Sequence, residues 1–199
     1  MKHSASSLFF SAALALTVLS GCAGMPAQQN FPDLSYRHLA PINLAVGGVS
    51  VESRYIPPLK APNVEHLAPV PPYNALRQWG LDRLRATGGS DRARLVILDA
   101  SIVETKLAVT GGIKGAFTRD QAARYDGKLV AMIEIVDTAG RQRAFATARA
   151  ERSQTVPEGT TVAEREKVWF TLTEDLMRQI NEQLESNIAR HLRAHMSVR

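Results

Sequence analysis

The fold is decided by a stretch in the middle of the chain that reads YDGKLVAMIEIVDTAGRQRAFATARAER, residues 125–152. In its first half, aliphatic side chains occupy every second position, which is the period of a β-strand. Asp137-Thr138-Ala139-Gly140 then supplies the residues of a tight turn. Two strands, 125–137 and 141–152, are therefore expected to pair as an antiparallel hairpin.

The two faces of this hairpin differ in polarity. One face is apolar or small, and it is made by Leu129, Ala131, Ile133 and Ile135 on the first strand and by Gln142, Ala144, Ala146, Ala148 and Ala150 on the second. The opposite face of the second strand carries Arg141, Arg143, Phe145, Thr147, Arg149 and Glu151. Because the charges are confined to one side, the second strand is expected to be half exposed.

Two further elements are expected just upstream. Residues 95–103 form a near-continuous apolar run, which is typical of a central strand buried on both faces. Residues 73–87 predict an amphipathic helix that Gly88-Gly89 would end. Its apolar stripe contains Leu76, Trp79 and Leu84, while Arg77, Asp82, Arg83 and Arg85 fall on the side expected to meet solvent.

Closer to the N-terminus, residues 43–52 predict a first strand, and the Gly47-Gly48 pair inside it predicts a bulge or a close backbone contact. Six prolines between 56 and 72 exclude a helix or a central strand, so an extended surface segment is expected there. Residues 106–120 mix glycines with apolar side chains and leave a hairpin and a loop open as interpretations.

The last element is a long helix, from 162 to about 193. Thr161 followed by Glu164 resembles a capping box. Apolar residues then recur every three or four positions, at Trp169, Leu172, Leu176, Ile180, Leu184, Ile188 and Leu192. At about 1.5 Å per residue such a helix is about 48 Å long, so one end is expected to project beyond a small sheet or to fray. The order strand, helix, strand, strand, strand, helix predicts an α+β fold, with two helices on one face of an antiparallel-rich sheet.

The N-terminus has a different character. An apolar run from Leu8 to Leu19 follows the positive start Met1-Lys2 and is too short to span a bilayer. It ends in Leu19-Ser20-Gly21-Cys22, which resembles the lipobox of bacterial lipoproteins, and Cys22 is the only cysteine among the 199 residues. Residues 1–21 are therefore expected to be a signal peptide, and the Cys22 thiol is expected to be acylated.

The lipobox implies a particular organisation. Residues 22–41 are rich in proline, glutamine and asparagine and predict a flexible tether, so 42–199 is expected to form a single periplasmic domain. Lipoprotein sorting implies that Ala23 after the cysteine favours the outer membrane. The chain is then lipid-anchored at the periplasmic face and does not span the membrane.

No catalytic constellation is visible in the sequence. The nucleophile elbow, the phosphate-binding loop and the zinc-helix motif are all absent, and Gly111-Gly112-Ile113-Lys114-Gly115 lacks the context of a nucleotide site. His191 and His195 share a helical spacing of four but have no carboxylate between them, so solvated histidines are the better interpretation. We expect a protein that is not an enzyme and that has neither a cofactor nor a metal site.

Basic residues are concentrated between 106 and 152. They are Lys106, Lys114, Arg119, Arg124, Lys128, Arg141, Arg143, Arg149 and Arg152. Such a surface favours an anionic bilayer or lipid phosphates, although a plain solvated strand face has the same composition. Nucleic-acid binding is disfavoured by the export signal and by the lack of interleaved aromatic residues.

Arg124-Tyr125-Asp126-Gly127-Lys128, followed by a hairpin and a long amphipathic helix, resembles the ABC-type transport auxiliary lipoproteins. These are outer-membrane partners of MCE-domain proteins in envelope lipid transport. The strand 43–52 and the helix around 76–84 fall in the matching order, whereas 105–123 and the extended last helix depart from it. The resemblance implies docking to an MCE assembly and a homo-oligomeric ring, with Arg124, Tyr125, Asp126, Lys128, Arg141, Arg143 and Arg149 as candidate contacts to the partner or to phospholipid.

Two alternatives remain. The same order of elements resembles the small lipoprotein that plugs the lipopolysaccharide-assembly barrel, which implies insertion into a barrel and contact with lipopolysaccharide. A purely structural envelope lipoprotein that tethers layers through its long helix is the other.

Overall fold

The computed structural model describes residues 29–108 and 121–197, and it is built around the hairpin of β5 (Gln121–Val136) and β6 (Gln142–Pro157). These strands pair antiparallel, and β5 also pairs antiparallel with β4 (Arg92–Lys106). A shorter strand, β2 (Gly48–Ser53), runs parallel to β4 at the other edge, so the sheet order is β2-β4-β5-β6. The predicted hairpin and the central position of residues 95–103 are both confirmed, and the α+β class is confirmed with them.

The hairpin turn has the chemistry expected of it. Gly140 takes a positive φ of 78°, and its N–H donates to the Asp137 carbonyl over 2.9 Å. The backbone N–H groups of Ala139 and Arg141 both donate to the Asp137 side chain. These hydrogen bonds, above all the one from the Arg141 backbone, hold the pKa of Asp137 below its ordinary value.

The single first strand predicted over 43–52 is wrong, because the chain forms two strands there. β1 (Ile42–Leu44) pairs parallel with β3 (Leu84–Ala86) in a separate two-stranded sheet, and β2 begins only at Gly48. The expected close contact lies at Gly47, where a Cβ atom would be 2.6 Å from the carbonyl oxygen of Gly89. Only glycine fits this crossing of two backbones, which moves the chain from one sheet to the other.

The first helix is shorter than predicted. α1 spans Pro72–Arg83, and the chain then passes directly into β3, so 84–87 is not helical. Pro72 occupies the first turn, where its missing N–H costs nothing. The Gly88-Gly89 pair, with positive φ values of 113° and 135°, ends β3 instead of the helix.

The proline-rich segment follows the free edge of β4. Its extended course is interrupted by a short 3-10 helix, Glu65–Leu67. The buried carboxylate of Glu65 accepts hydrogen bonds from the hydroxyl of Tyr55 at 2.7 Å and from the backbone N–H of Ile102 at 3.2 Å. A backbone N–H on the part of β4 that β2 does not reach is therefore hydrogen-bonded by a side chain.

The last helix, α2, spans Val162–His191, and the capping box between Thr161 and Glu164 is confirmed. The expected projecting end is wrong. β5 and β6 each have 16 residues and so extend about 53 Å, whereas the 30 residues of α2 extend about 45 Å. The sheet is therefore long enough to cover the whole helix, and even Ile188 and Leu192 near the end of the helix are buried.

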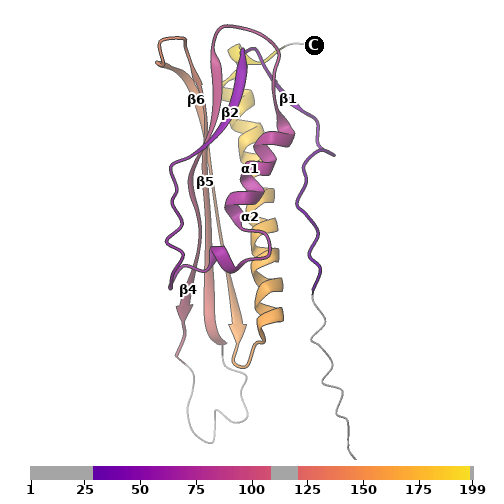
Figure 1. Cartoon of the computed structure of the whole chain (residues 1–199), viewed down its shortest axis with the longest axis vertical. Coiled ribbons are helices and arrows are strands. Elements are labelled where there is room, and N and C mark those ends of the chain that lie inside the picture. Colours follow the sequence, from indigo (N-terminus) through magenta and orange to yellow (C-terminus); the bar gives the residue numbers. More distant parts are fainter. Residues whose placement is uncertain (1–28, 109–120, 198–199) are drawn as a thin grey trace, which may run out of the picture.

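Both helices lie on the same face of the sheet (Figure 1). Gly80 of α1 lies against Leu95, and Gly127 of β5 lies against Leu172 and Leu176 of α2. Leu95 pairs with Ile133, which is on the same face as Gly127 because six residues separate them along β5. The core therefore lies between one sheet face and two helices, and the other face has no helix over it in the described residues.

Candidate functional site

The described chain begins with a strap, defined here as residues 29–41, that lies along both helices (Figure 1). It starts beside the first turns of α2 and runs in the same direction as that helix, toward β1. Tyr36 is buried in the core, and the ring of Phe31 lies 5.1 Å from that of Phe170. The flexible tether predicted for 22–41 is therefore wrong for its second half, because the folded domain begins well before Ile42.

Asp82 of α1 holds the middle of the strap. Its carboxylate is 6% exposed and accepts from the backbone N–H of Tyr36 at 2.9 Å and from Arg37 Nε at 3.2 Å. Gln78 also donates to it over 2.8 Å, and the Ser35 hydroxyl over 3.3 Å. Burial alone would raise the pKa of Asp82, but these hydrogen bonds outweigh it and lower the pKa below its ordinary value.

Arg83, the next residue, joins the end of the strap to both helices. Its side chain is 3% exposed and donates to the Ala40 carbonyl at 2.8 Å, to Asn181 Oδ1 at 2.6 Å and to Glu185 at 2.6 Å. Trp79 Nε1 donates to the same Asn181 oxygen over 2.8 Å. Asp82 and Arg83 were expected on the solvent side of the helix, and that expectation is wrong because the strap covers them.

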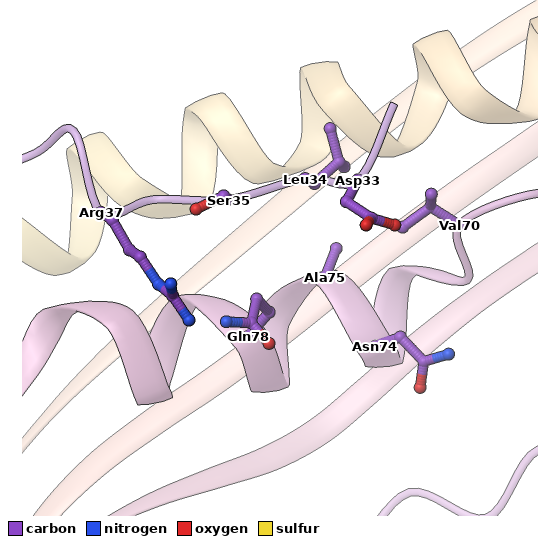
Figure 2. A pocket seen from close by; sticks show the side chains of 8 residues that line it. All are labelled: Asp33, Leu34, Ser35, Arg37, Val70, Asn74, Ala75 and Gln78. Carbon is purple, nitrogen blue, oxygen red and sulfur yellow. The ribbon is translucent and has the colours of Figure 1, made fainter. Parts of the chain in front are cut away.

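Clefts line the strap on both sides. The cleft toward α1 measures about 480 Å³ and is lined by Asp33, Leu34, Ser35, Arg37, Val70, Asn74, Ala75 and Gln78 (Figure 2). In Figure 2 the strap passes between the two helices, and Arg37 reaches down toward α1 beside Gln78. The cleft toward α2 measures about 350 Å³ and includes Met177 and Asn181. The strap is thus fixed at a few polar points with open space between them.

Replacing Asp82 with asparagine is expected to loosen the strap. The new amide nitrogen would face donors, so the Tyr36 N–H or the Gln78 amide loses its acceptor, at about 1–3 kcal/mol. Amide hydrogen exchange at Tyr36 should then accelerate about tenfold or more at neutral pH. Asp175→Asn is the control, since Asp175 is exposed and bonds Arg178 only; equal acceleration in both variants would contradict the role of Asp82.

The Asp82 carboxylate should also make the packing of the strap sensitive to acid. Because the pKa of Asp82 is lower in the folded state than its ordinary value of about 3.9, its contribution is complete above that value. It is lost as the pH falls through the lowered pKa. The Tyr36 amide resonance, followed by NMR from pH 6 to pH 2, should shift in wild type and stay flat in Asp82→Asn.

The predicted contact residues of β5 lie on the sheet face without helices. Arg124, Asp126 and Lys128 alternate with helix-facing residues along the strand. Arg124 Nε donates to Asp126 at 2.9 Å, and Lys128 Nζ lies 2.7 Å from Asp99. The structure therefore brings these three together as neighbours, with each base beside a carboxylate.

Tyr125 is not available as a surface contact, which corrects the prediction for this residue. Its side chain faces the helices and is fully buried, with its ring edge-on to Trp169 at a centroid distance of 5.5 Å. Burial raises the pKa of its hydroxyl above the ordinary value. Strand alternation explains the difference, because neighbouring residues of one motif point to opposite faces.

The basic residues of the second strand are also exposed. Arg141 and Arg143 both approach Asp137, at 2.9 Å and 4.0 Å, and Arg149 pairs with Glu151. They occupy different heights on β6, with Arg141 and Arg143 at the turn and Arg149 further along the strand. The seven predicted residues thus form no single pocket.

Several predictions concern residues outside the described ranges, namely Leu19 to Cys22, most of 106–120, and Lys114 and Arg119 within it. Across 29–108 and 121–197, no group of three or more His, Cys, Asp or Glu side chains is placed to hold a metal ion. Within those ranges no helix combines the length and apolar character needed to cross a membrane.

No protein-family model matches the chain, and no curated protein sequence matches it. Among solved structures, rare lipoprotein B of Shewanella oneidensis is similar at 14% identity and a TM-score of 0.38, covering 72% of this chain and 96% of that one. A minor lipoprotein of Acinetobacter baumannii is similar at 18% identity and a TM-score of 0.34, covering 76% and 96%. A Xanthomonas campestris protein of the DUF330 family is similar at 10% identity and a TM-score of 0.28, covering 77% and 94%. Two of these neighbours carry the name lipoprotein.

Proposed function

We propose that this protein is an envelope lipoprotein, held at the periplasmic face of the outer membrane by an acylated Cys22, and that it serves as a binding component of a lipid-transport complex of the ABC/MCE type. The observation that carries the proposal is the position of the chain's single thiol at the end of a lipobox. An acyl chain contributes about 0.8 kcal/mol per buried methylene, so more than one chain anchors the protein stably.

The strap supports this proposal by making the anchor short. Only six residues lie between Cys22 and Gln29, where the described chain begins, and a fully extended chain covers at most about 3.6 Å for each of the seven steps. The anchor therefore lies within about 25 Å of the strap's first residue. A domain held this closely is presented to the bilayer in a restricted set of orientations.

A binding role, not a catalytic one, is supported by the chemistry of the exposed surfaces. The sheet face without helices carries ion pairs such as Lys128 with Asp99 and Arg149 with Glu151. These groups suit recognition of a charged partner or a lipid phosphate.

Replacing Cys22 with serine should release the protein from membranes. Wild type is expected in the membrane fraction with an acyl mass on its N-terminal peptide, and Cys22→Ser in the soluble fraction without one. Ser20→Ala keeps a small residue before the cysteine and is the matched control, which should behave as wild type. A Cys22→Ser protein that still carried acyl mass would contradict the anchor.

The transport role is tested by extracting the tagged native protein from its own cells in mild detergent and identifying everything retained by mass spectrometry. Recovery of an MCE-domain protein or of phospholipid is expected. A large barrel protein with lipopolysaccharide would instead indicate the barrel-plug function. Recovery of an oligomer of this chain alone would leave the structural lipoprotein.

A further inference from the structure

We propose that the end of the molecule opposite the strap's first residue docks an extended acidic segment of a partner protein. This inference rests on the proposed function for the direction of the anchor. The surface, called here the arginine end, is defined by six exposed arginines from five different parts of the chain: Arg85, Arg92, Arg141, Arg143, Arg190 and Arg193.

These arginines meet at one end of the fold. Arg92 opens β4 and pairs with Val136, the last residue of β5, beside the turn that leads to Arg141. The C-terminal end of α2 reaches the same place, since the His195 carbonyl accepts from Ala45 N–H at 2.8 Å, next to β1. Figure 1 places the β5–β6 turn, β1 and the end of α2 together.

The charge at this end is poorly balanced. Its acidic residues are Asp91 and Asp137, and Asp137 already serves both Arg141 and Arg143. The other four arginines have no carboxylate within ion-pair distance anywhere in the described ranges. By contrast, Arg124 and Arg165, nearer the opposite end, lie beside Asp126 and Glu104. Four guanidinium groups without a carboxylate partner favour a ligand rich in carboxylates, because arginine binds a carboxylate through two parallel hydrogen bonds.

A cleft beside the arginine end suits an extended chain. It measures about 430 Å³ and lies between β6 and α2, lined by Gln142, Arg143, Ala144, Phe145, Ala146, Thr147, Asn187 and His191. Phe145 is 50% exposed there, which gives the cleft an aromatic surface beside Arg143. Aromatic residues and arginine are both enriched in protein interfaces.

Side chains of α2 cover the edge of β6 at Thr147 and Arg149 and leave it open at Phe145. Gln183 of α2 accepts from the Arg149 N–H at 3.0 Å, and Asn187 donates to the Thr147 carbonyl at 2.7 Å. Strand alternation points the backbone of Phe145 toward the same edge, and no side chain of α2 bonds it in the described structure. An extended segment can therefore add to β6 at this point, as in strand addition.

The tether to the proposed anchor and the arginine end lie at opposite ends of α2. Phe31 packs on Phe170, and Arg190 lies twenty helical steps, about 30 Å, further along α2. The tether of about 25 Å starts near Phe170, at the other end of α2. The arginine end therefore lies far from the point where the tether leaves the domain, which favours a protein over the anchoring bilayer as its ligand.

The test uses the acylated full-length protein in neutral detergent and a fluorescent eight-residue peptide in which glutamate and valine alternate. Anisotropy titration should show saturable binding. The triple variant Arg143→Glu, Arg190→Glu, Arg193→Glu should bind at least tenfold more weakly, and Phe145→Ala about fivefold. The triple variant Arg124→Glu, Arg152→Glu, Lys167→Glu changes the net charge equally elsewhere and should stay within twofold of wild type. Thermal melts confirm that each variant is folded.

Three results would overturn the proposal. Equal weakening in both triple variants would mean attraction by net charge alone. Equal binding of a peptide with lysine in place of glutamate would exclude carboxylate recognition. Binding of vesicles containing phosphatidylglycerol that the first triple variant abolishes would make lipid phosphate the ligand. Intact mass of the same preparation reports acylation at Cys22, so failure of the anchor is recognised separately from failure of the docking surface.

Discussion

Replacing Trp79 with alanine is expected to lower the free energy of unfolding by about 3–5 kcal/mol, as loss of a fully buried aromatic side chain does. Trp79 is 0% exposed and lies where α1, α2 and the sheet meet. The substitution removes its packing and leaves a cavity that the sheet is too rigid to close. Chemical denaturation followed by circular dichroism measures the difference.

Two controls separate the causes of this loss. Trp79→Phe keeps most of the ring and removes only the bond to Asn181, which Arg83 still serves, so about 1–2 kcal/mol is expected. Val162→Ala removes a side chain that is 71% exposed and should change stability by less than about 0.5 kcal/mol. A loss below about 1 kcal/mol for Trp79→Ala would show that this junction is not a centre of the core.

Replacing Arg83 with alanine is expected to cost about 3 kcal/mol and to free the end of the strap. The substitution leaves the Ala40 carbonyl without its donor, and it removes a buried guanidinium that bonds both Asn181 and Glu185. Hydrogen exchange over residues 36–41 should accelerate together with the loss of stability, because the strap ends on this side chain.

Arg83→Lys tests whether the charge or the shape matters. Lysine keeps the charge but cannot reach three acceptors in one plane, so it should recover only part of the stability. Arg85→Ala is the control, because Arg85 lies only two residues further along the chain, in β3. Arg85 is exposed and bonds only the carbonyls of Leu81 and Leu84, so its loss should be within about 0.5 kcal/mol. Equal effects for both arginines would contradict the role of Arg83.

Strong periodicity made part of the fold predictable. The hairpin and the capped last helix each repeat one period over ten or more residues, and the central strand is a near-continuous apolar run, so local pattern and tertiary packing agree. Shorter elements were missed where the partner is distant in sequence. β1 and β3 have three residues each, and only their pairing with one another defines them.

The strap shows why the candidate site was predicted least well. Asp82 and Arg83 look like solvent-facing charges on a helix, because nothing local reveals that residues 29–41 cover them. Phe31 and Tyr36 were the available signal, since isolated aromatic residues in a proline-rich tether are unusual unless they are buried. Likewise, the seven candidate contact residues were chosen along the sequence, whereas the arginine end combines side chains from segments far apart in it.

The direction of the strap also has a mechanical consequence. The strap lies lengthwise along α2, and a pull from an anchor at Cys22 acts along that length. A pull in this direction is a shear load, and it acts at the same time on the contacts made by Phe31, Tyr36, Asp82 and Arg83. If the strap were instead pulled outward from one end, these contacts would break one after another. How long the strap stays packed on the helices under tension is governed by the rate at which this whole set of contacts is broken. With the proposed anchor at Cys22, the strap would bear the force between the lipid and the domain besides covering two helices.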